Sequence, residues 1–176
     1  MRPPGKARRP RISGIFEGGV TQPGGMQCRP NAGGLAPQAA TALADTGALI
    51  ACLDRDDPWH DPCRDAFEHL RLPLFSSTAV LTELFHLVGD NKREVERAWA
   101  FIRTGAVTVL SISDRDLPDL EGLMAKYRDP PMDFADATLV HLAQRESLST
   151  VFTIDHDDFE TYRIGGRKRF RIVPAK

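Results

Sequence analysis

Short, largely apolar runs alternate with longer amphipathic stretches along residues 41–176. Runs of this length with little polar alternation are typical of strands that are buried on both faces of a sheet. Turn-forming Gly, Pro, Asn and Asp residues separate the runs from the stretches that follow them. The predicted strands are residues 41–45, 72–76, 106–112 and 150–155.

Between these strands, apolar residues recur at helical spacing. In the charged stretch after Gly89, for example, Val95, Ala98, Trp99 and Ile102 fall on one face. Gly89 itself is a suitable end for the preceding helix. The predicted helices are residues 46–54, 58–70, 78–88, 91–103, 113–127 and 133–146, with a further helical turn at 157–162.

Strands that alternate with helices predict an α/β fold in which a mostly parallel central sheet carries helices on both faces. Near the C-terminal end, Gly165 and Gly166 suit a tight turn between residues 162–164 and 170–173. No internal repeat is present in the chain, so we expect one folded domain over residues 41–176.

Residues 1–40 differ from this pattern because they are rich in Gly, Pro and Arg and have no hydrophobic period. Such a composition cannot bury a core, and we therefore predict a disordered leader. It carries six basic residues and one acid, whereas the remainder carries 17 basic and 23 acidic residues. We interpret the leader as a dispensable extension, with a basic tail that touches nucleic acid as the alternative.

The charge balance and the cysteines limit the kinds of function and the cellular compartment that the sequence suggests. An acidic domain that handles nucleic acid needs metal ions or local basic patches to offset phosphate repulsion. The cysteines are Cys28, Cys52 and Cys63, without a CxxC pair, which argues against a zinc site and favours a reducing cytoplasm. No apolar run is long enough to span a membrane, and the leader lacks the apolar stretch of a signal peptide.

Two predicted strands end in a carboxylate. Asp45 is the last residue of the strand predicted at 41–45, and Asp155 is the last residue of the strand predicted at 150–155. Because ligands bind beyond the carboxyl ends of strands in open α/β sheets, both acids are expected to face a site. Thr46 is expected to cap the helix after Asp45.

Other acids lie on predicted helices, and each has a structural alternative. Glu83 lies on an apolar helical stripe, so it is expected to point partly inward, although a pairing with Arg or a capping role would also explain it. Asp133 and Asp136 suit the N-cap and the third position of their helix, and Asp136 would still be able to face a site there. Asp157 and Asp158 are interpreted as turn and cap residues.

Together, Asp45, Glu83, Asp136 and Asp155 would form a strongly negative pocket of oxygen ligands. Mg²⁺ or Mn²⁺ suits such a pocket, and ions held in this way commonly activate water for attack on a phosphodiester. The five histidines are scattered along the chain and suggest no competing metal site.

These residues resemble the motifs of the PIN-domain ribonucleases, in particular the VapC-type toxins of bacterial toxin–antitoxin pairs. The resemblance covers about residues 42–174, and its motifs occur in the family's order and spacing. The leader departs from the pattern, because such toxins usually begin a few residues before the first acid. The matching segments are ADTGALI at 44–50, TEL at 82–84, MDFADATLV at 132–140 and TID at 153–155, with Asp158 and Phe159 behind them.

The resemblance implies a PIN-like three-layer sandwich and Mg²⁺-dependent endoribonuclease activity. It also implies a homodimer that is inhibited by a small antitoxin encoded beside the toxin. By the matching positions, the catalytic and metal-binding quartet is Asp45, Glu83, Asp136 and Asp155, with Asp133 as a further candidate ligand and Thr153 in the polar position before the last acid.

Candidate substrate contacts are Thr46 and Thr153 beside the acids, and Arg167 and Lys168 in a basic C-terminal segment that would otherwise be a solvated hairpin. A catalytically inactive PIN-like scaffold that binds RNA or protein is the alternative function. A phosphatase of the HAD type is disfavoured, because it needs an acid two residues after the first Asp, where this chain has Gly47.

Overall fold

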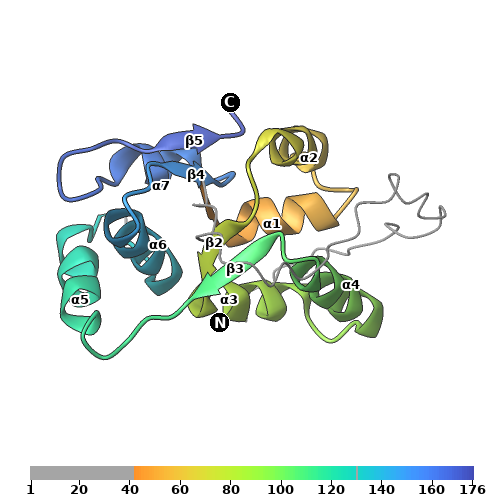
Figure 1. The fold of residues 1–176 in the computed structure, drawn as a ribbon, viewed down its shortest axis with the longest axis horizontal. Coiled ribbons are helices and arrows are strands. Elements are labelled where there is room, and N and C mark those ends of the chain that lie inside the picture. Colours follow the sequence, from red (N-terminus) through yellow and green to blue (C-terminus); the bar gives the residue numbers. More distant parts are fainter. Residues whose placement is uncertain (1–41, 130) are drawn as a thin grey trace, which may run out of the picture.

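The computed structural model describes residues 42–129 and 131–176, which form a layered α/β domain (Figure 1). The predicted disordered leader, residues 1–40, and Cys28 lie outside the described residues. In the part of the chain that is described, none of the helices has the length and apolar character needed to cross a membrane.

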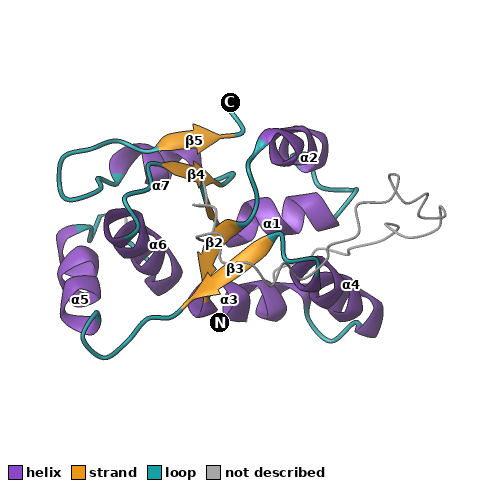
Figure 2. Cartoon of the chain, viewed as in Figure 1, coloured by secondary structure: helices purple, strands orange, loops and turns teal. Residues whose placement is uncertain are grey.

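Five short parallel strands form the central sheet, in the spatial order β3-β2-β1-β4-β5. Figure 2 shows β2, β3, β4 and β5 of this sheet among the helices. The prediction of a mostly parallel sheet is confirmed. The first strand is central and completely buried, because Ala42, Leu43 and Ala44 expose no surface. The strands are β1 (Leu43–Ala44), β2 (Leu74–Ser77), β3 (Val107–Leu110), β4 (Thr150–Phe152) and β5 (Arg171–Val173).

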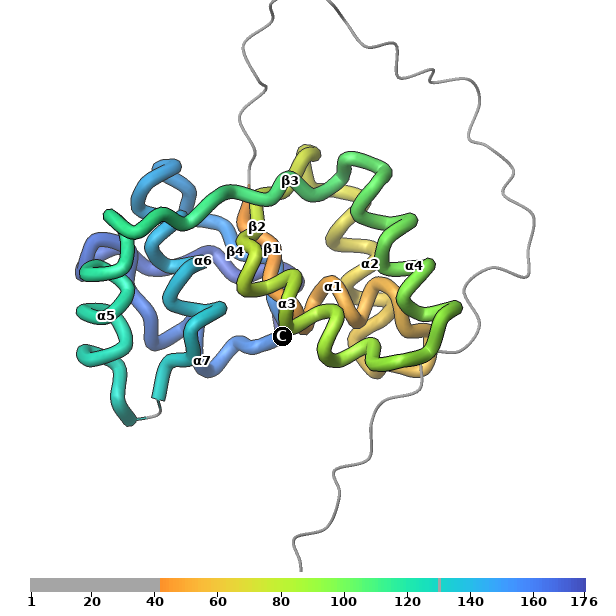
Figure 3. The backbone as a smooth tube through the Cα atoms, turned by 90° about the horizontal axis from the view of Figure 1, so that it is seen from below, coloured from red at the N-terminus to blue at the C-terminus, as the bar shows by residue number. Residues whose placement is uncertain are grey.

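Helices cover both faces of the sheet, as the alternating pattern predicted. Figure 3 shows α1, α2 and α4 on one side of the strands and α5 and α6 on the other. Helix α3 packs against α1, α4 and α6, so it joins the two layers. The helices are α1 (Thr46–Leu53), α2 (His60–His69), α3 (Thr78–Val88), α4 (Lys92–Arg103), α5 (Leu117–Lys126), α6 (Phe134–Arg145) and α7 (His156–Thr161).

The predicted C-terminal hairpin is only partly correct. Gly165 and Gly166 have φ angles of 57° and 76°, and they make the turn of an antiparallel bridge between Ile164 and Lys168. Residues 171–173 do not continue this hairpin, because they pair in parallel with β4 as the edge strand β5. The open edge of β4 therefore determines the position of β5, and the local turn does not.

Gly47 permits a close approach at the start of α1. A Cβ atom at this position would lie 2.8 Å from Ile154 Cγ1, which is too close for any side chain without a shift of Ile154. An acid two residues after Asp45 would therefore require Ile154 to move, in agreement with the argument against a HAD-type site.

The two described cysteines contribute to the packing of α1 on α2. Cys63 is buried and Cys52 is half-buried, and burial raises the pKa of both thiols to about 12. Both thiols are therefore protonated near neutral pH and behave as small apolar side chains, as predicted.

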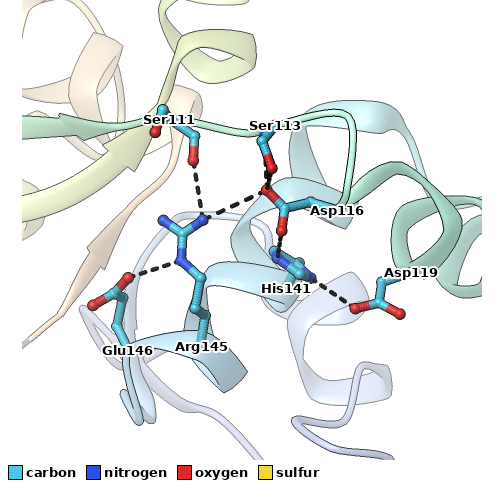
Figure 4. A network of polar contacts seen from close by, with 7 residues as sticks. All are labelled: Ser111, Ser113, Asp116, Asp119, His141, Arg145 and Glu146. Carbon is cyan, nitrogen blue, oxygen red and sulfur yellow. Dashed lines mark hydrogen bonds and ion pairs between the residues drawn. The ribbon is translucent and has the colours of Figure 1, made fainter.

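A polar network fixes α6 to the segment between β3 and α5 (Figure 4). Asp116 accepts hydrogen bonds from the backbone N–H and the hydroxyl of Ser113, at 2.7 and 2.9 Å. It also lies 3.3 Å from His141 Nε2 and 3.7 Å from Arg145 Nη1, which both belong to α6. Arg145 Nη1 in turn donates to the carbonyl oxygen of Ser111 at 3.0 Å. The body of α6 is thereby held, and its N-terminal turn reaches the carboxyl end of the sheet.

Candidate acidic active site

Asp45 lies directly after β1 and is the N-cap of α1, with 7% of its surface exposed. Its Oδ1 accepts from the backbone N–H of Thr46 at 2.6 Å, and its Oδ2 accepts from Thr153 Oγ1 at 2.7 Å. The prediction that Thr46 caps α1 is therefore wrong, because Asp45 caps the helix itself. Burial raises the pKa of Asp45 to about 6; the two hydrogen bonds oppose this, and the charges of Glu83 and Asp133 add to it.

Thr46 instead connects the first acid to the second. Its hydroxyl donates to Glu83 Oε2 at 2.8 Å and lies 3.3 Å from the carbonyl oxygen of Val80. Glu83 is half-buried on α3, as its apolar stripe predicted. Its hydrogen-bond partner is thus a threonine of the first motif, which places the Glu83 carboxylate at the same sheet edge as Asp45.

Asp133 and Asp136 occupy the positions that the sequence predicted at the start of α6. Asp133 is the N-cap, and its Oδ1 accepts from the backbone N–H of Asp136 at 2.8 Å. The Asp136 side chain is buried, and burial raises its pKa to about 8, with the charges of Asp45 and Asp133 as further causes. Asp136 is thus the third residue of the helix, and the charges that act on its carboxylate are those of neighbouring acids.

Asp155 does not lie beside Asp45 in the sheet. Strand β4 ends at Phe152, and continuing its register with β1 by one residue places Thr153 opposite Asp45. Asp155 is exposed and is the N-cap of α7, and its backbone N–H donates to Thr153 Oγ1 at 2.9 Å. The strand predicted for residues 150–155 was thus too long, and Thr153 bridges the two aspartates.

The sequence prediction did not include Tyr162 in the site, and it gave Asp158 only a structural role. Tyr162 is buried, and its hydroxyl donates to Asp136 Oδ2 at 3.1 Å. Asp158 was interpreted as a turn residue, but its pKa is raised by partial burial and by the charges of Asp155 and Asp133, while a hydrogen bond from Tyr162 opposes the shift. Helical spacing was the available signal, because Asp155, Asp158 and Tyr162 are three and four residues apart.

A contact between two buried hydroxyl groups connects α3 to α6. Ser77 caps α3 and lies 2.7 Å from Thr138 Oγ1 on α6, and both residues expose no surface. This contact fixes the helix that carries Glu83 relative to the helix that carries Asp136. The spacing of the acids therefore follows from buried packing and not from their own charges.

The chemistry of these side chains fits a hard divalent cation. All the candidate ligands are carboxylate oxygens, and the raised pKa values of Asp45 and Asp136 show that burial and like charges disfavour their ionised forms. A cation would offset both effects. Within residues 42–129 and 131–176, no group of three or more His, Cys, Asp or Glu side chains is arranged to hold an ion as it stands.

A cleft of about 580 Å³ opens next to Glu83 and Asp133, between α3 and the first turn of α6. The predicted basic contacts Arg167 and Lys168 are exposed in the loop between α7 and β5, so their role stays a prediction. Of the predicted substrate contacts, Thr46 and Thr153 both hydrogen-bond to site carboxylates.

Comparisons with known proteins agree with this architecture. A model of the PIN domain family matches residues 42–164. The chain is 29% identical over 135 residues to ribonuclease VapC26 of Mycobacterium tuberculosis. This alignment covers 75% of this chain and 99% of VapC26. The crystal structure of Mycobacterium tuberculosis VapC20, described as a sarcin–ricin loop cleaving toxin, superposes with a TM-score of 0.61 at 18% identity, covering 66% of this chain and 92% of VapC20.

Proposed function

Because this chain belongs to the PIN domain family, we propose that it is a metal-dependent endoribonuclease and the toxin of a toxin–antitoxin pair. The proposal rests on one observation, the meeting of three segments that are distant in sequence. Asp45 accepts a hydrogen bond from the backbone N–H of Thr46, and the hydroxyl of Thr46 donates to Glu83. Asp136 is buried, and the charge of Asp45 contributes to its raised pKa. Similarity to a protein named as a ribonuclease supports the same reaction class.

The residues that would hold Mg²⁺ or Mn²⁺ are Asp45, Glu83, Asp136 and Asp155, with Asp133 as a further ligand. When it is bound, such an ion lowers the pKa of water and stabilises the leaving oxygen of a phosphodiester. This set would be both the catalytic and the metal-binding part of the site.

The other polar residues orient these carboxylates. Thr153 donates to Oδ2 of Asp45 and Thr46 donates to Oε2 of Glu83. Tyr162 donates to Oδ2 of Asp136, which leaves Oδ1 of that carboxyl for a cation or, in its absence, for a proton near neutral pH. A site whose groups are fixed before the substrate arrives needs less reorganisation during the reaction.

The alternative function is an inactive scaffold that binds RNA or protein. A scaffold needs no buried carboxylates, which destabilise a fold unless they are paired, hydrogen-bonded or bound to metal. Here Asp45 and Asp136 are both buried, and both have raised pKa values despite the hydrogen bonds that they accept, which favours a site that uses these carboxylates over a scaffold.

We further propose an RNA substrate, a small antitoxin as the partner, and a homodimer. The names of the relatives support the RNA substrate and the antitoxin: VapC26 is named a ribonuclease and VapC20 a toxin that cleaves the sarcin–ricin loop. The acidic character of the domain suits a mechanism in which cations mediate contact with RNA phosphates.

The test is RNA cleavage by the purified protein with Mg²⁺, with EDTA, and with Mg²⁺ added back. We expect cleavage only when Mg²⁺ is present, and a loss of at least about 100-fold in the variant Asp45→Asn, which keeps the side-chain shape but removes a charged ligand. Thermal melting controls for folding of the variant. Cleavage that persists in EDTA, or a fully active Asp45→Asn protein, would refute the proposed metal mechanism.

A further inference from the structure

The cleft beside the acids has two unlike walls. One wall is the face of α3 that carries Thr78, Thr82 and His86, which are spaced four residues apart and so lie in one row. The opposite wall is formed by Phe134 and Ala135 at the start of α6. Glu83 and Asp133 belong to the lining as well, so the cleft is continuous with the acidic site.

Phe134 is the first residue of α6, and 46% of its surface is exposed. The residues that follow it, Ala135 and Asp136, are buried, so the start of the helix packs well without this ring. The ring therefore offers an open aromatic face in the cleft.

The charges of the side chains that line the cleft determine which chemical groups can bind there. Its two carboxylates, Glu83 and Asp133, repel a phosphate group, and His86 is the only residue in the lining that is able to carry a positive charge. Apolar and hydroxyl-bearing side chains make up the rest. A flat, uncharged group with hydrogen-bonding edges suits such a lining, and a nucleobase is the group of this kind that RNA carries.

We propose that this cleft binds a nucleobase next to the scissile phosphate, with the base stacked on Phe134 and its edge toward His86 and Thr82. The inference rests on the proposed function and specifies its substrate. A base inside a duplex is stacked between its neighbours and cannot enter a side cleft, so the RNA is single-stranded or looped at the cut. Phe134 is then a residue that contacts the substrate and determines where along the RNA the acids act.

The test compares Phe134→Ala with a matched control, Leu117→Ala. Leu117 is also the first residue of a helix, also follows an Asp at the N-cap, and is 47% exposed, but it lies on α5 and is absent from the cleft lining. Phe134→Tyr keeps the ring and serves as the rescue variant. Because both side chains are exposed, we expect all three variants to melt close to the wild type.

We expect Phe134→Ala to weaken the binding of a short single-stranded RNA about tenfold, measured by fluorescence anisotropy with Mg²⁺ in the cleavage-deficient Asp45→Asn background. With Asp45 intact, it should raise KM for Mg²⁺-dependent cleavage by a similar factor with kcat little changed. Leu117→Ala and Phe134→Tyr should bind and cleave like the wild type. A duplex of the same sequence should be a poor substrate for every variant.

RNAs with a single abasic nucleotide identify the stacked position. Removing the base that occupies the cleft should weaken binding to the wild type about tenfold and should have a much smaller effect on Phe134→Ala, because that variant has already lost the stacking contact. Equal RNA binding by Phe134→Ala and the wild type would overturn the inference, and so would losses that add to that of Phe134→Ala at every abasic position. The proposed function stands in either case as long as the wild type cleaves RNA. A wild type that neither cleaves nor binds RNA overturns both.

Discussion

Asp45 and Asp155 follow neighbouring parallel strands, but their surroundings in the structure differ. Asp45 is buried, accepts two hydrogen bonds and has a raised pKa, whereas Asp155 is exposed at the start of α7. The difference arises because β4 ends earlier relative to its acid than β1 does, so that Thr153 takes the position opposite Asp45. In this sheet, the acid that immediately follows its strand is buried, and the acid three residues beyond its strand is exposed.

The same contrast divides the site into a rigid part and an open part. In the rigid part, Thr153 and Thr46 tie Asp45 and Glu83 to the sheet edge and to α3. In the open part, Asp155 caps the short helix α7 and Asp158 lies in its first turn, where solvent reduces charge repulsion. We expect changes in the rigid part to alter stability and changes in the open part to alter mainly the interaction with cations.

The largest effect is expected from Asp136→Asn in the metal-free protein. Because the folded pKa values of Asp136 and Asp45 lie near 8 and 6, above the usual value near 4, the folded state binds more protons than the unfolded state. Wild-type stability should therefore fall as pH rises from about 4 to about 8, by on the order of a few kcal/mol. Asp136→Asn should flatten this profile and make the metal-free protein more stable at pH 8.

Thermal melts at several pH values, with and without Mg²⁺, measure this effect. Mg²⁺ should raise the melting temperature of the wild type more at pH 7 than at pH 5, where protons compete for the same oxygens, and it should raise that of Asp136→Asn less. A destabilised Asp136→Asn protein with an unchanged Mg²⁺ response would instead indicate a purely structural Asp136.

The next largest effect is expected from Thr153→Val, which keeps the shape but removes the hydroxyl group between the two aspartates. Thr153 Oγ1 donates to Asp45 and accepts from the backbone N–H of Asp155, so the variant loses both contacts. We expect a loss of about 1–3 kcal/mol in chemical denaturation. Thr153→Ser should recover most of it, and Thr150→Val, at the other end of β4, is the control. Equal stability of both valine variants would show that the bridge contributes nothing.

A smaller effect is expected from Tyr162→Phe, because the ring packing stays and one hydrogen bond to Asp136 is lost. Stability should change by about 1 kcal/mol. The Mg²⁺-induced shift in melting temperature should fall, since Asp136 loses the group that orients it. Tyr127→Phe is a matched control, because the Tyr127 hydroxyl accepts from the backbone N–H of Arg163 and not from an acid. An identical Mg²⁺ response in both variants would argue against a positioning role for Tyr162.

The smallest effect on folding is expected from Asp155→Asn. Its side chain is exposed, and an amide still accepts the hydrogen bond from the backbone N–H of Asp158. The free energy of unfolding should change by less than about 0.5 kcal/mol, while cleavage and the Mg²⁺ response decrease if the carboxylate is a ligand. A large loss of stability would contradict the division of the site into a rigid and an open part.

The sequence by itself determined the elements of the fold. Strand and helix positions follow from local apolar periodicity, and the start of α6 follows from the capping preferences of Asp133 and Asp136, because both depend on neighbours within a few residues. The motif spacing likewise predicted the family, while the convergence of the four acids on one cation stays a prediction.

Only the tertiary structure decided which of these acids are buried and which groups orient them. The register between β1 and β4 places Thr153 opposite Asp45, although 108 residues separate the two. Thr46 reaches Glu83, and Tyr162 reaches Asp136, only after α1, α3, α6 and α7 have packed. Periodicity describes one segment at a time, whereas burial, pKa and the cleft at Phe134 depend on contacts between segments, so the site's electrostatics emerge only when the domain folds.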